Sequence, residues 1–154
     1  RFYLDGWIFF GWLSILLLSR ELKKNFIILI PFVAYLILFI FAIPNEPSHG
    51  WYRYPFYPFL IIAAAITILD EAKKISLITI FFLLFVGLSL LSNFWQNVFG
   101  FSYTVYRVFI ISSVAPVIYI LWKDIKGRNS QILIFSWTAL FIIFNIISVL
   151  SYVE

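Results

Sequence analysis

The sequence predicts an all-α protein, a polytopic transmembrane bundle of about six helical spans joined by short loops. Two observations carry this prediction. Of the 154 residues, 64% are hydrophobic and only 12% are charged, with a mean hydropathy of +1.03. The apolar residues also fall in runs of a length that suits the roughly 20 residues needed to cross a bilayer core. The expected spans cover residues 6–19, 26–43, 55–69, 75–92, 104–122 and 131–152.

Polar residues and prolines mark the ends of the first two spans. Asp5 is a suitable N-cap for the first span, and a charged loop over residues 20–25 separates it from the second. Pro31 lies near the start of the second span. Pro44 is expected to end that span, because proline cannot continue a helix.

The third span follows residues 49–58, the most polar and aromatic stretch of the chain (HGWYRYPFYP). Proline disfavours helix in the residue before it, so Tyr54 and Tyr57 are expected to be extended and Pro58 to lie in the first helical turn. Regular helix over residues 59–69 would rise only about 17 Å, against roughly 30 Å of hydrocarbon. The preceding residues are therefore expected to dip below the outer interface and line a cavity. A helix that starts earlier, near Tyr54, is the alternative.

The last three spans are bounded by the charged segments 70–74 and 123–129 and by a polar-aromatic loop over residues 93–103. Pro116 lies inside the fifth span, where a kink is expected. The whole chain, residues 1–154, is expected to be one transmembrane domain. Because it begins with Arg and contains no Met, we expect it to be part of a longer polypeptide.

The cations are distributed unevenly between the two sides of this topology. Eight of the eleven lie in the first, third and fifth loops: Arg20, Lys23, Lys24, Lys73, Lys74, Lys123, Lys126 and Arg128. The positive-inside rule places these loops in the cytoplasm. Both ends of the chain and residues 49–58 are then expected to face outward.

The outward loops supply the candidate site residues. Arg53 precedes the N-terminus of the third helix, where a planar guanidinium and unpaired backbone N–H groups suit a phosphate. Arg107 is a further candidate for phosphate binding, and His49 is a candidate ligand or catalyst. The aromatic residues of this stretch, Trp51, Tyr52, Tyr54 and Tyr57, place ring faces beside the anion site. Arginines and aromatic residues that simply anchor the helices at the interface are the competing interpretation.

Several classes of function are disfavoured by the composition. With one His and no Cys, neither a protein-built metal site nor a thiol nucleophile is expected, and no cofactor is predicted. A net charge of +4 without a long basic run does not favour nucleic-acid binding. No charged residue falls in the middle of a span, as an ion-coupled transporter would require.

The run GWYRYPFYPFLIIAAA, residues 50–65, resembles the R-Y-x-x-P-x-Y-P-F-L segment of integral-membrane glycosyltransferases of the protein O-mannosyltransferase and aminoarabinose-transferase type. These enzymes have the C-type membrane fold, and YLDGW at residues 3–7 is also similar to them. The resemblance implies a sugar donor linked to polyprenyl or dolichyl phosphate, transfer on the outer face of the membrane, and a lipid phosphate near Arg53 and His49. It also implies contact of this donor with Trp51, Tyr52, Tyr54 and Tyr57. Membrane lipid and this donor are the expected partners.

The chain departs from the family in one respect. The family's acidic catalytic residues lie in the first outward loop of its N-terminal half, and no counterpart is found here. The chain is therefore expected to be the C-terminal membrane half of such an enzyme, which binds the lipid phosphate and depends on the missing N-terminal half for catalysis. The alternative is a non-enzymatic six-helix scaffold subunit or a facilitator for a small solute.

Overall fold

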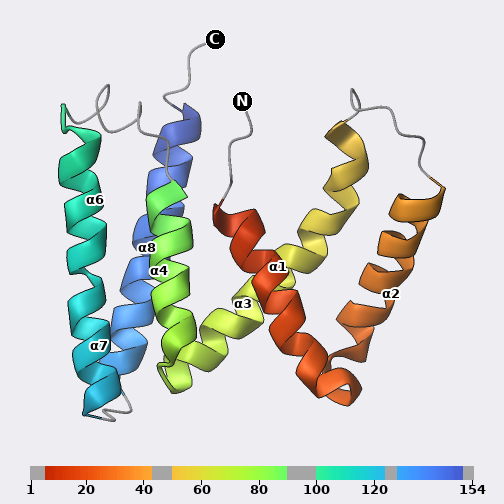
Figure 1. Cartoon of the computed structure of the whole chain (residues 1–154), viewed down its shortest axis with the longest axis horizontal. Coiled ribbons are helices and arrows are strands. Elements are labelled where there is room, and N and C mark those ends of the chain that lie inside the picture. The colour runs from red at the N-terminus through yellow and green to blue at the C-terminus, as the bar shows by residue number, and fades with distance from the viewer. Residues whose placement is uncertain (1–5, 43–49, 90–99, 124–127, 151–154) are drawn as a thin grey trace. The chain divides into compact units, whose positions relative to one another are not determined.

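The computed structural model describes residues 6–42, 50–89, 100–123 and 128–150, and every regular element in these ranges is helical. The all-α fold class is therefore confirmed for this part of the chain (Figure 1). In chain order the elements are α1 (Gly6–Leu18), the 3-10 helix η1 (Ser19–Glu21), α2 (Leu22–Phe41), the 3-10 helix η2 (Gly50–Phe56), α3 (Tyr57–Lys73), α4 (Leu77–Ser89), α6 (Tyr103–Ser112), α7 (Val114–Trp122) and α8 (Arg128–Leu150).

Within the described ranges, four helical runs are long and apolar enough to cross a membrane: Gly6–Phe41, Tyr52–Lys73, Tyr103–Trp122 and Arg128–Ser148. The helix α4 is apolar but has only 13 residues. Many large hydrophobic side chains are exposed along these helices, and a lipid environment accounts for such a surface. The chain is therefore an integral membrane protein. The count of about six crossings stays a prediction.

The helices begin earlier than expected at two charged segments. Most of the loop predicted over residues 20–25 is helical, because α2 starts at Leu22, and only η1 separates it from α1. The amide Nδ2 of buried Asn25 donates a hydrogen bond to the Leu18 carbonyl at 3.0 Å. This bond satisfies one of the carbonyls left unpaired at the end of α1. Likewise α3 continues to Lys73 and α8 begins at Arg128, because lysine and arginine are good helix formers.

The start of the third span also differs from the prediction. Tyr54 belongs to η2 and Tyr57 to α3, so the extended conformation expected of both was wrong. Pro58 lies in the first turn of α3, as predicted. Proline is tolerated in the first turn of α3, because the N–H that it lacks would have no partner within that helix. The helical run Tyr52–Lys73 has 22 residues, a rise of roughly 33 Å. This run is long enough for a bilayer, so no dip is needed.

By its contacts the chain divides into two compact units, which are described separately. The N-terminal unit is Trp7–Thr67 and the C-terminal unit is Ile68–Glu154 with Arg1–Gly6. In the N-terminal unit α1 and α2 run in opposite directions from η1 and diverge away from it (Figure 1). Its core consists of buried residues from α1, α2, η2 and α3: Ile15, Leu18, Leu29, Phe32, Phe56, Leu60 and Ala63.

A glycine allows α1 and α3 to approach closely in this core. A Cβ added at Gly11 would lie 2.7 Å from the Cβ of Leu60 and 3.1 Å from the Leu60 carbonyl oxygen. Neither atom can swing aside, since one is attached directly to the backbone and the other belongs to it. Only glycine therefore fits at this crossing without a shift of a helix.

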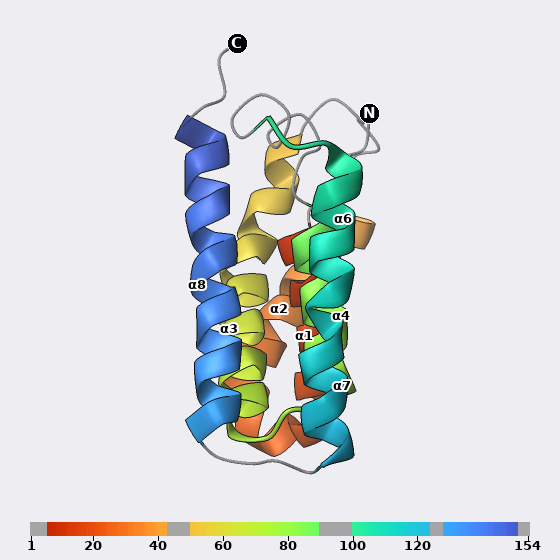
Figure 2. The same cartoon turned by 90° about the vertical axis from the view of Figure 1, so that its left-hand side faces the viewer.

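In the C-terminal unit α4 packs against α6, α7 and α8 (Figure 2). The most deeply buried side chains come from all four helices, and include Leu83, Ile110, Val117 and Phe141. The boundary between α6 and α7 lies at Ser113, whose Oγ donates a hydrogen bond to the Ile110 carbonyl at 2.6 Å. Pro116 follows in the first turn of α7. The helix is therefore interrupted close to the proline, where a kink was expected.

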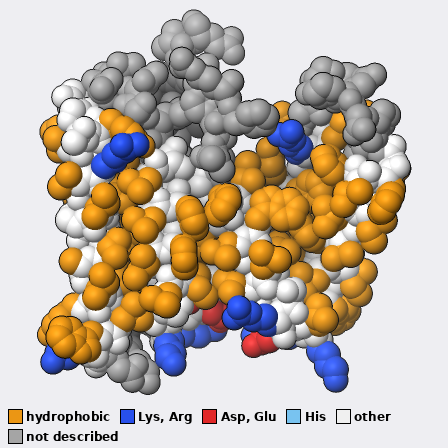
Figure 3. All heavy atoms as spheres, viewed as in Figure 1, with side chains coloured by type: hydrophobic (Ala, Val, Ile, Leu, Met, Phe, Trp, Pro, Cys, Tyr) orange, Lys and Arg blue, Asp and Glu red, His pale blue; other side chains and the backbone are white. Residues whose placement is uncertain are grey.

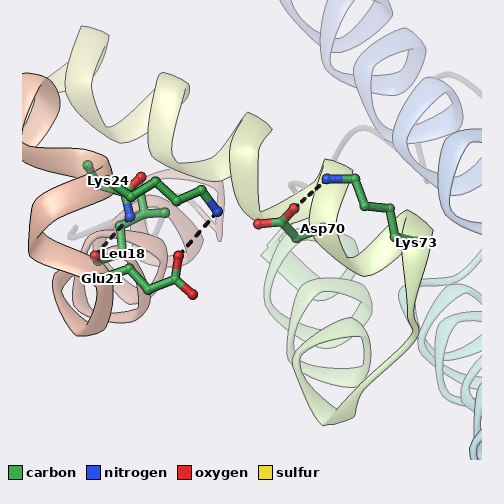
Figure 4. Close-up of polar contacts among 6 residues, drawn as sticks. Leu18, Glu21, Lys24, Asp70 and Lys73 are labelled. Atoms are coloured by element: carbon green, nitrogen blue, oxygen red, sulfur yellow. Dashed lines mark hydrogen bonds and ion pairs between the residues drawn. The ribbon is translucent and has the colours of Figure 1, made fainter.

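The Lys and Arg side chains visible in Figure 3 lie at helix ends, and the surface between them is mainly hydrophobic. Two exposed ion pairs form within single helical turns, Glu21–Lys24 at 3.1 Å and Asp70–Lys73 at 2.8 Å (Figure 4). Exposed pairs of this kind contribute only about 0.3–0.5 kcal/mol each. The fold therefore depends on packing and buried hydrogen bonds far more than on these charges.

Candidate functional site

The candidate site in the N-terminal unit is built on η2, and one buried side chain anchors this short helix. Phe56 is only 4% exposed. Its ring centroid lies 4.9 to 5.6 Å from those of four aromatic residues on α1 and α2, namely Trp12, Phe32, Tyr35 and Phe39. The contacts with Phe32, Tyr35 and Phe39 are edge-to-face, an arrangement that stabilises ring pairs beyond the area that they bury. Phe56 therefore holds the end of η2 against two helices.

A hydrogen bond fixes the beginning of η2 as well. The Tyr35 hydroxyl on α2 donates to the Tyr52 carbonyl oxygen at 2.8 Å. A 3-10 helix of seven residues is longer than most, and such helices have poorer internal hydrogen bonds than α-helices. Tertiary contacts from Tyr35 and Phe56 therefore hold it in place. Any side chain on its exposed surface is presented by a fixed backbone.

Arg53, Tyr54 and Pro55 are on the exposed surface of η2. Arg53 forms no ion pair or hydrogen bond with any residue that the structure describes, so its guanidinium donors are available. The Tyr54 ring lies 5.6 Å from that of Tyr57 on the first turn of α3, tilted by 47°. This segment thus carries a cation directly before two neighbouring aromatic rings in the sequence. A phosphate with an attached sugar or a lipid headgroup has the matching chemistry.

The other predicted contacts divide into three groups. Tyr57 is half-buried at the edge of the core, and Tyr52 is half-buried with its carbonyl already bonded. The side chain of Trp51 and all of His49 lie outside the described residues. Arg107 is on α6 and belongs to the C-terminal unit. Arg53, Tyr54 and Tyr57 are therefore the predicted residues that one described surface segment brings together.

Arg107 has a well-defined setting of its own. Its guanidinium carbon lies 4.3 Å from the centre of the Tyr103 ring, a cation–π distance. The Tyr103 hydroxyl donates to the Leu88 carbonyl at 3.1 Å, and the neighbouring Tyr106 hydroxyl donates to the Gly87 carbonyl. Both hydroxyls tie α6 to α4, so the ring beneath Arg107 cannot move freely.

One buried acidic residue was not singled out from the sequence. Glu71 is 7% exposed, near the end of α3, and its carboxylate accepts three hydrogen bonds. The donors are the Ser76 backbone N–H at 2.8 Å, the Ser76 hydroxyl at 2.7 Å and the Thr79 hydroxyl at 2.6 Å. The Ser76 hydroxyl in turn accepts from Ile78 N–H at 3.1 Å. The cluster caps the N-terminus of α4, and its carboxylate is occupied in this structural role.

One member of this cluster, Ser76, could be recognised from the sequence. Ser76 stands directly before the apolar run of α4, which is the position of an N-cap. The distance in sequence from Glu71 to Ser76 and Thr79 fits no standard capping box, because the acid comes from the preceding helix. The acid was therefore read as part of a charged loop. The missing information was the sharp turn between α3 and α4.

Among the described residues, no group of three His, Cys, Asp or Glu side chains lies close enough to hold a metal ion. Comparison of the chain with protein-family models, with curated protein sequences and with solved structures finds no match.

Proposed function

We propose that this chain is the lipid-phosphate-binding part of a membrane-embedded glycosyltransferase. The donor would be a sugar linked to polyprenyl or dolichyl phosphate on the outer face of the membrane, and the catalytic acids would come from outside these 154 residues. The observation that carries the proposal is the exposed Arg53, which pairs with no described residue and lies on η2, a helix that Phe56 and Tyr35 hold in place.

The segment that resembles the glycosyltransferases separates into two kinds of residue. Phe56, Leu60 and Ala63 are buried in the core of the N-terminal unit, so packing alone accounts for them. Arg53 and Tyr54 are exposed, and packing does not account for either. An exposed arginine beside a tyrosine on a fixed backbone is suited to an anionic ligand that approaches from the membrane interface. This division supports a binding role for the exposed residues.

Six crossings and the orientation of the chain belong to the same proposal. The cation-rich segments around Arg20, Lys73 and Lys123 would face the cytoplasm, and η2 would face outward, with both ends of the chain on its side. Arg107 would then lie on the same outward side, near the start of α6. His49 and Trp51 remain proposed contacts because of their place in the sequence beside Arg53.

The experiment measures binding of polyprenyl phosphate to the purified chain and to the variants Arg53→Ala and Arg53→Lys. Removing a charge-assisted contact at an exposed site should weaken the binding free energy by about 1.5 kcal/mol, which is roughly a tenfold loss of affinity. Lysine keeps the charge and loses the planar fork, so Arg53→Lys should recover binding only in part. Arg20→Ala is the matched control, because Arg20 is an exposed arginine of η1, at the opposite end of the α1–α2 hairpin.

A scaffold subunit is the competing function, because an exposed arginine beside Tyr54 also suits a simple interface anchor. The two functions predict different outcomes for the same variants. An anchor would tolerate Arg53→Lys fully, and Arg53→Ala would affect membrane insertion without affecting lipid affinity. Equal polyprenyl phosphate affinity of Arg53→Ala, Arg20→Ala and the wild type would remove Arg53 from the site and contradict the proposal.

A further inference from the structure

One face of α8 in the C-terminal unit carries a shallow hollow. Its lining residues are Arg128, Gln131, Ile132, Phe135, Ser136 and Ala139. These positions are three, four, seven, eight and eleven residues from the first, so they form one stripe along the helix. Ile134 and Phe141 project from the opposite side and are buried in the unit. The hollow therefore faces away from the core of its own unit.

The stripe changes in chemistry along its length. Arg128 and Gln131 give one end a cation and an amide, and neither side chain pairs with any described residue. Ile132 and Phe135 continue the stripe with apolar side chains that are 55% and 46% exposed. Beyond them, the small side chain of Ala139 leaves room beside the helix. The face is thus polar and cationic at one end and apolar at the other.

The length of this stripe matches one leaflet of a bilayer. The eleven-residue separation between Arg128 and Ala139 corresponds to a rise of about 16 Å. Half of a hydrocarbon core of roughly 30 Å is about 15 Å. A lipid with its headgroup at Arg128 would therefore place its acyl chain along the whole hollow.

Other residues mark the Arg128 end as the membrane interface. The helix α7 ends at Trp122, and Figure 2 shows this end at the same level as the start of α8. Trp122 is 82% exposed, and the Nζ atom of Lys123 lies 6.0 Å from its ring centre. Exposed tryptophan with nearby lysine and arginine is typical of the headgroup level of a membrane. The two acids described in this unit, Asp70 and Glu71, already have hydrogen-bond partners.

We infer that this face of α8 binds an anionic phospholipid. The headgroup phosphate lies against Arg128 and Gln131, and one acyl chain follows Ile132 and Phe135 to Ala139. The net charge of the headgroup selects this occupant, because Lys123 and Arg128, which form no ion pair with any described residue, favour an anionic lipid over a zwitterionic one. The site lies in the C-terminal unit and uses none of the residues proposed for sugar-donor binding. It therefore stands or fails independently of the proposed function.

Native mass spectrometry of the whole chain in detergent tests the inference. Phosphatidylglycerol and phosphatidylcholine with identical acyl chains are titrated separately. We expect tighter binding of phosphatidylglycerol, and roughly tenfold weaker binding to Arg128→Ala, which loses a charge-assisted contact. Lys74→Ala removes an equal charge from an exposed position on the same unit outside the hollow, and should change binding by less than about twofold.

A second pair of variants tests the place of the acyl chain without a change of charge. Ala139→Phe fills the hollow and should weaken phosphatidylglycerol binding severalfold. Ile146→Phe introduces the same residue on the same face two turns further along, where Ile146 is 53% exposed, and should have no effect. Circular dichroism checks that each variant is folded.

Four results would overturn the inference. Equal binding of the two lipids by the wild type would remove the selectivity for an anionic headgroup. Equal losses of phosphatidylglycerol affinity in Arg128→Ala and Lys74→Ala would show that the lipid is attracted by the overall positive charge and not by a site at Arg128. Unchanged binding by Ala139→Phe, or displacement of phosphatidylglycerol by an equal concentration of inorganic phosphate, would show that no acyl chain occupies the hollow.

Discussion

Replacing Glu71 should destabilise the C-terminal unit more than replacing the acid beside it. The Glu71 carboxylate accepts hydrogen bonds from Ser76 N–H, the Ser76 hydroxyl and the Thr79 hydroxyl, all within 2.8 Å. Thr79 is only 1% exposed, so water cannot replace the lost acceptor there. Ser76 is partly buried, so water can replace part of the hydrogen bonding that its N–H and hydroxyl lose. The main loss therefore falls on the contact with Thr79.

The magnitude follows from these contacts. Leaving a buried donor without an acceptor costs about 1–3 kcal/mol, and hydrogen bonds to charged groups are at the upper end. We expect Glu71→Ala to lower the free energy of unfolding by about 3 kcal/mol. Glu71→Gln keeps the shape and one acceptor oxygen, but turns an NH₂ group toward a donor, so a loss of about 1–2 kcal/mol is expected. Asp70→Asn should cost less than about 0.5 kcal/mol, because its bond to Lys73 is exposed.

The assay is reversible unfolding by sodium dodecyl sulfate in mixed micelles, followed by circular dichroism. A double-mutant cycle with Thr79→Val isolates the buried contact, and we expect a coupling energy of about 2 kcal/mol between positions 71 and 79. Equal unfolding free energies for Glu71→Ala and Asp70→Asn would refute the reasoning. A coupling energy of zero would show that the carboxylate does not act through Thr79.

Three further predictions concern the frame of the candidate site and its orientation. Phe56→Ala should lower the free energy of unfolding by about 2–4 kcal/mol in the same assay, because loss of the ring leaves a cavity among its aromatic neighbours. Tyr54→Ala, at a 62% exposed position, should lower it by less than about 0.5 kcal/mol. Gly11→Ala should be destabilising by about 1–3 kcal/mol, although alanine is the better helix former, since its Cβ would meet the Cβ of Leu60; a neutral or stabilising effect would contradict the close helix crossing. Cysteines placed at Ser48 and Asn129 should react with an impermeant reagent from opposite sides of the membrane, Ser48 from outside, and labelling from one side would contradict the proposed topology.

Much of the architecture could be predicted from the sequence, since the length and apolar character of a membrane helix are properties of the local sequence. A helix in lipid must satisfy its backbone internally, and that requirement alone turns a run such as residues 104–122 into helix. The observed run Tyr103–Trp122 differs from it by one residue. The position of Pro116 similarly indicated where this helix would be interrupted. Arg53 was also identified as a candidate from its type and its place before a helix.

Other features depended on contacts between residues far apart in the sequence. The local preferences of proline predicted an extended Tyr54. In the structure Tyr54 lies in a 3-10 helix instead. In this helix Phe56 packs against α1 and α2, and the Tyr52 carbonyl accepts a hydrogen bond from Tyr35. The sequence showed Glu71 as one charge among several. Only the turn between α3 and α4 brings it to the donors of Ser76 and Thr79.

The physical reason for this difference is the range over which each interaction acts. Hydropathy, helix propensity and proline geometry act within a few residues, so they determined the helices, their approximate ends and the class of membrane protein. Whether a particular side chain is buried or exposed depends on which helix lies against it. Tertiary packing therefore decided that Phe56 anchors η2 while Arg53 stays exposed, and that Glu71 is enclosed while Asp70 remains at the surface.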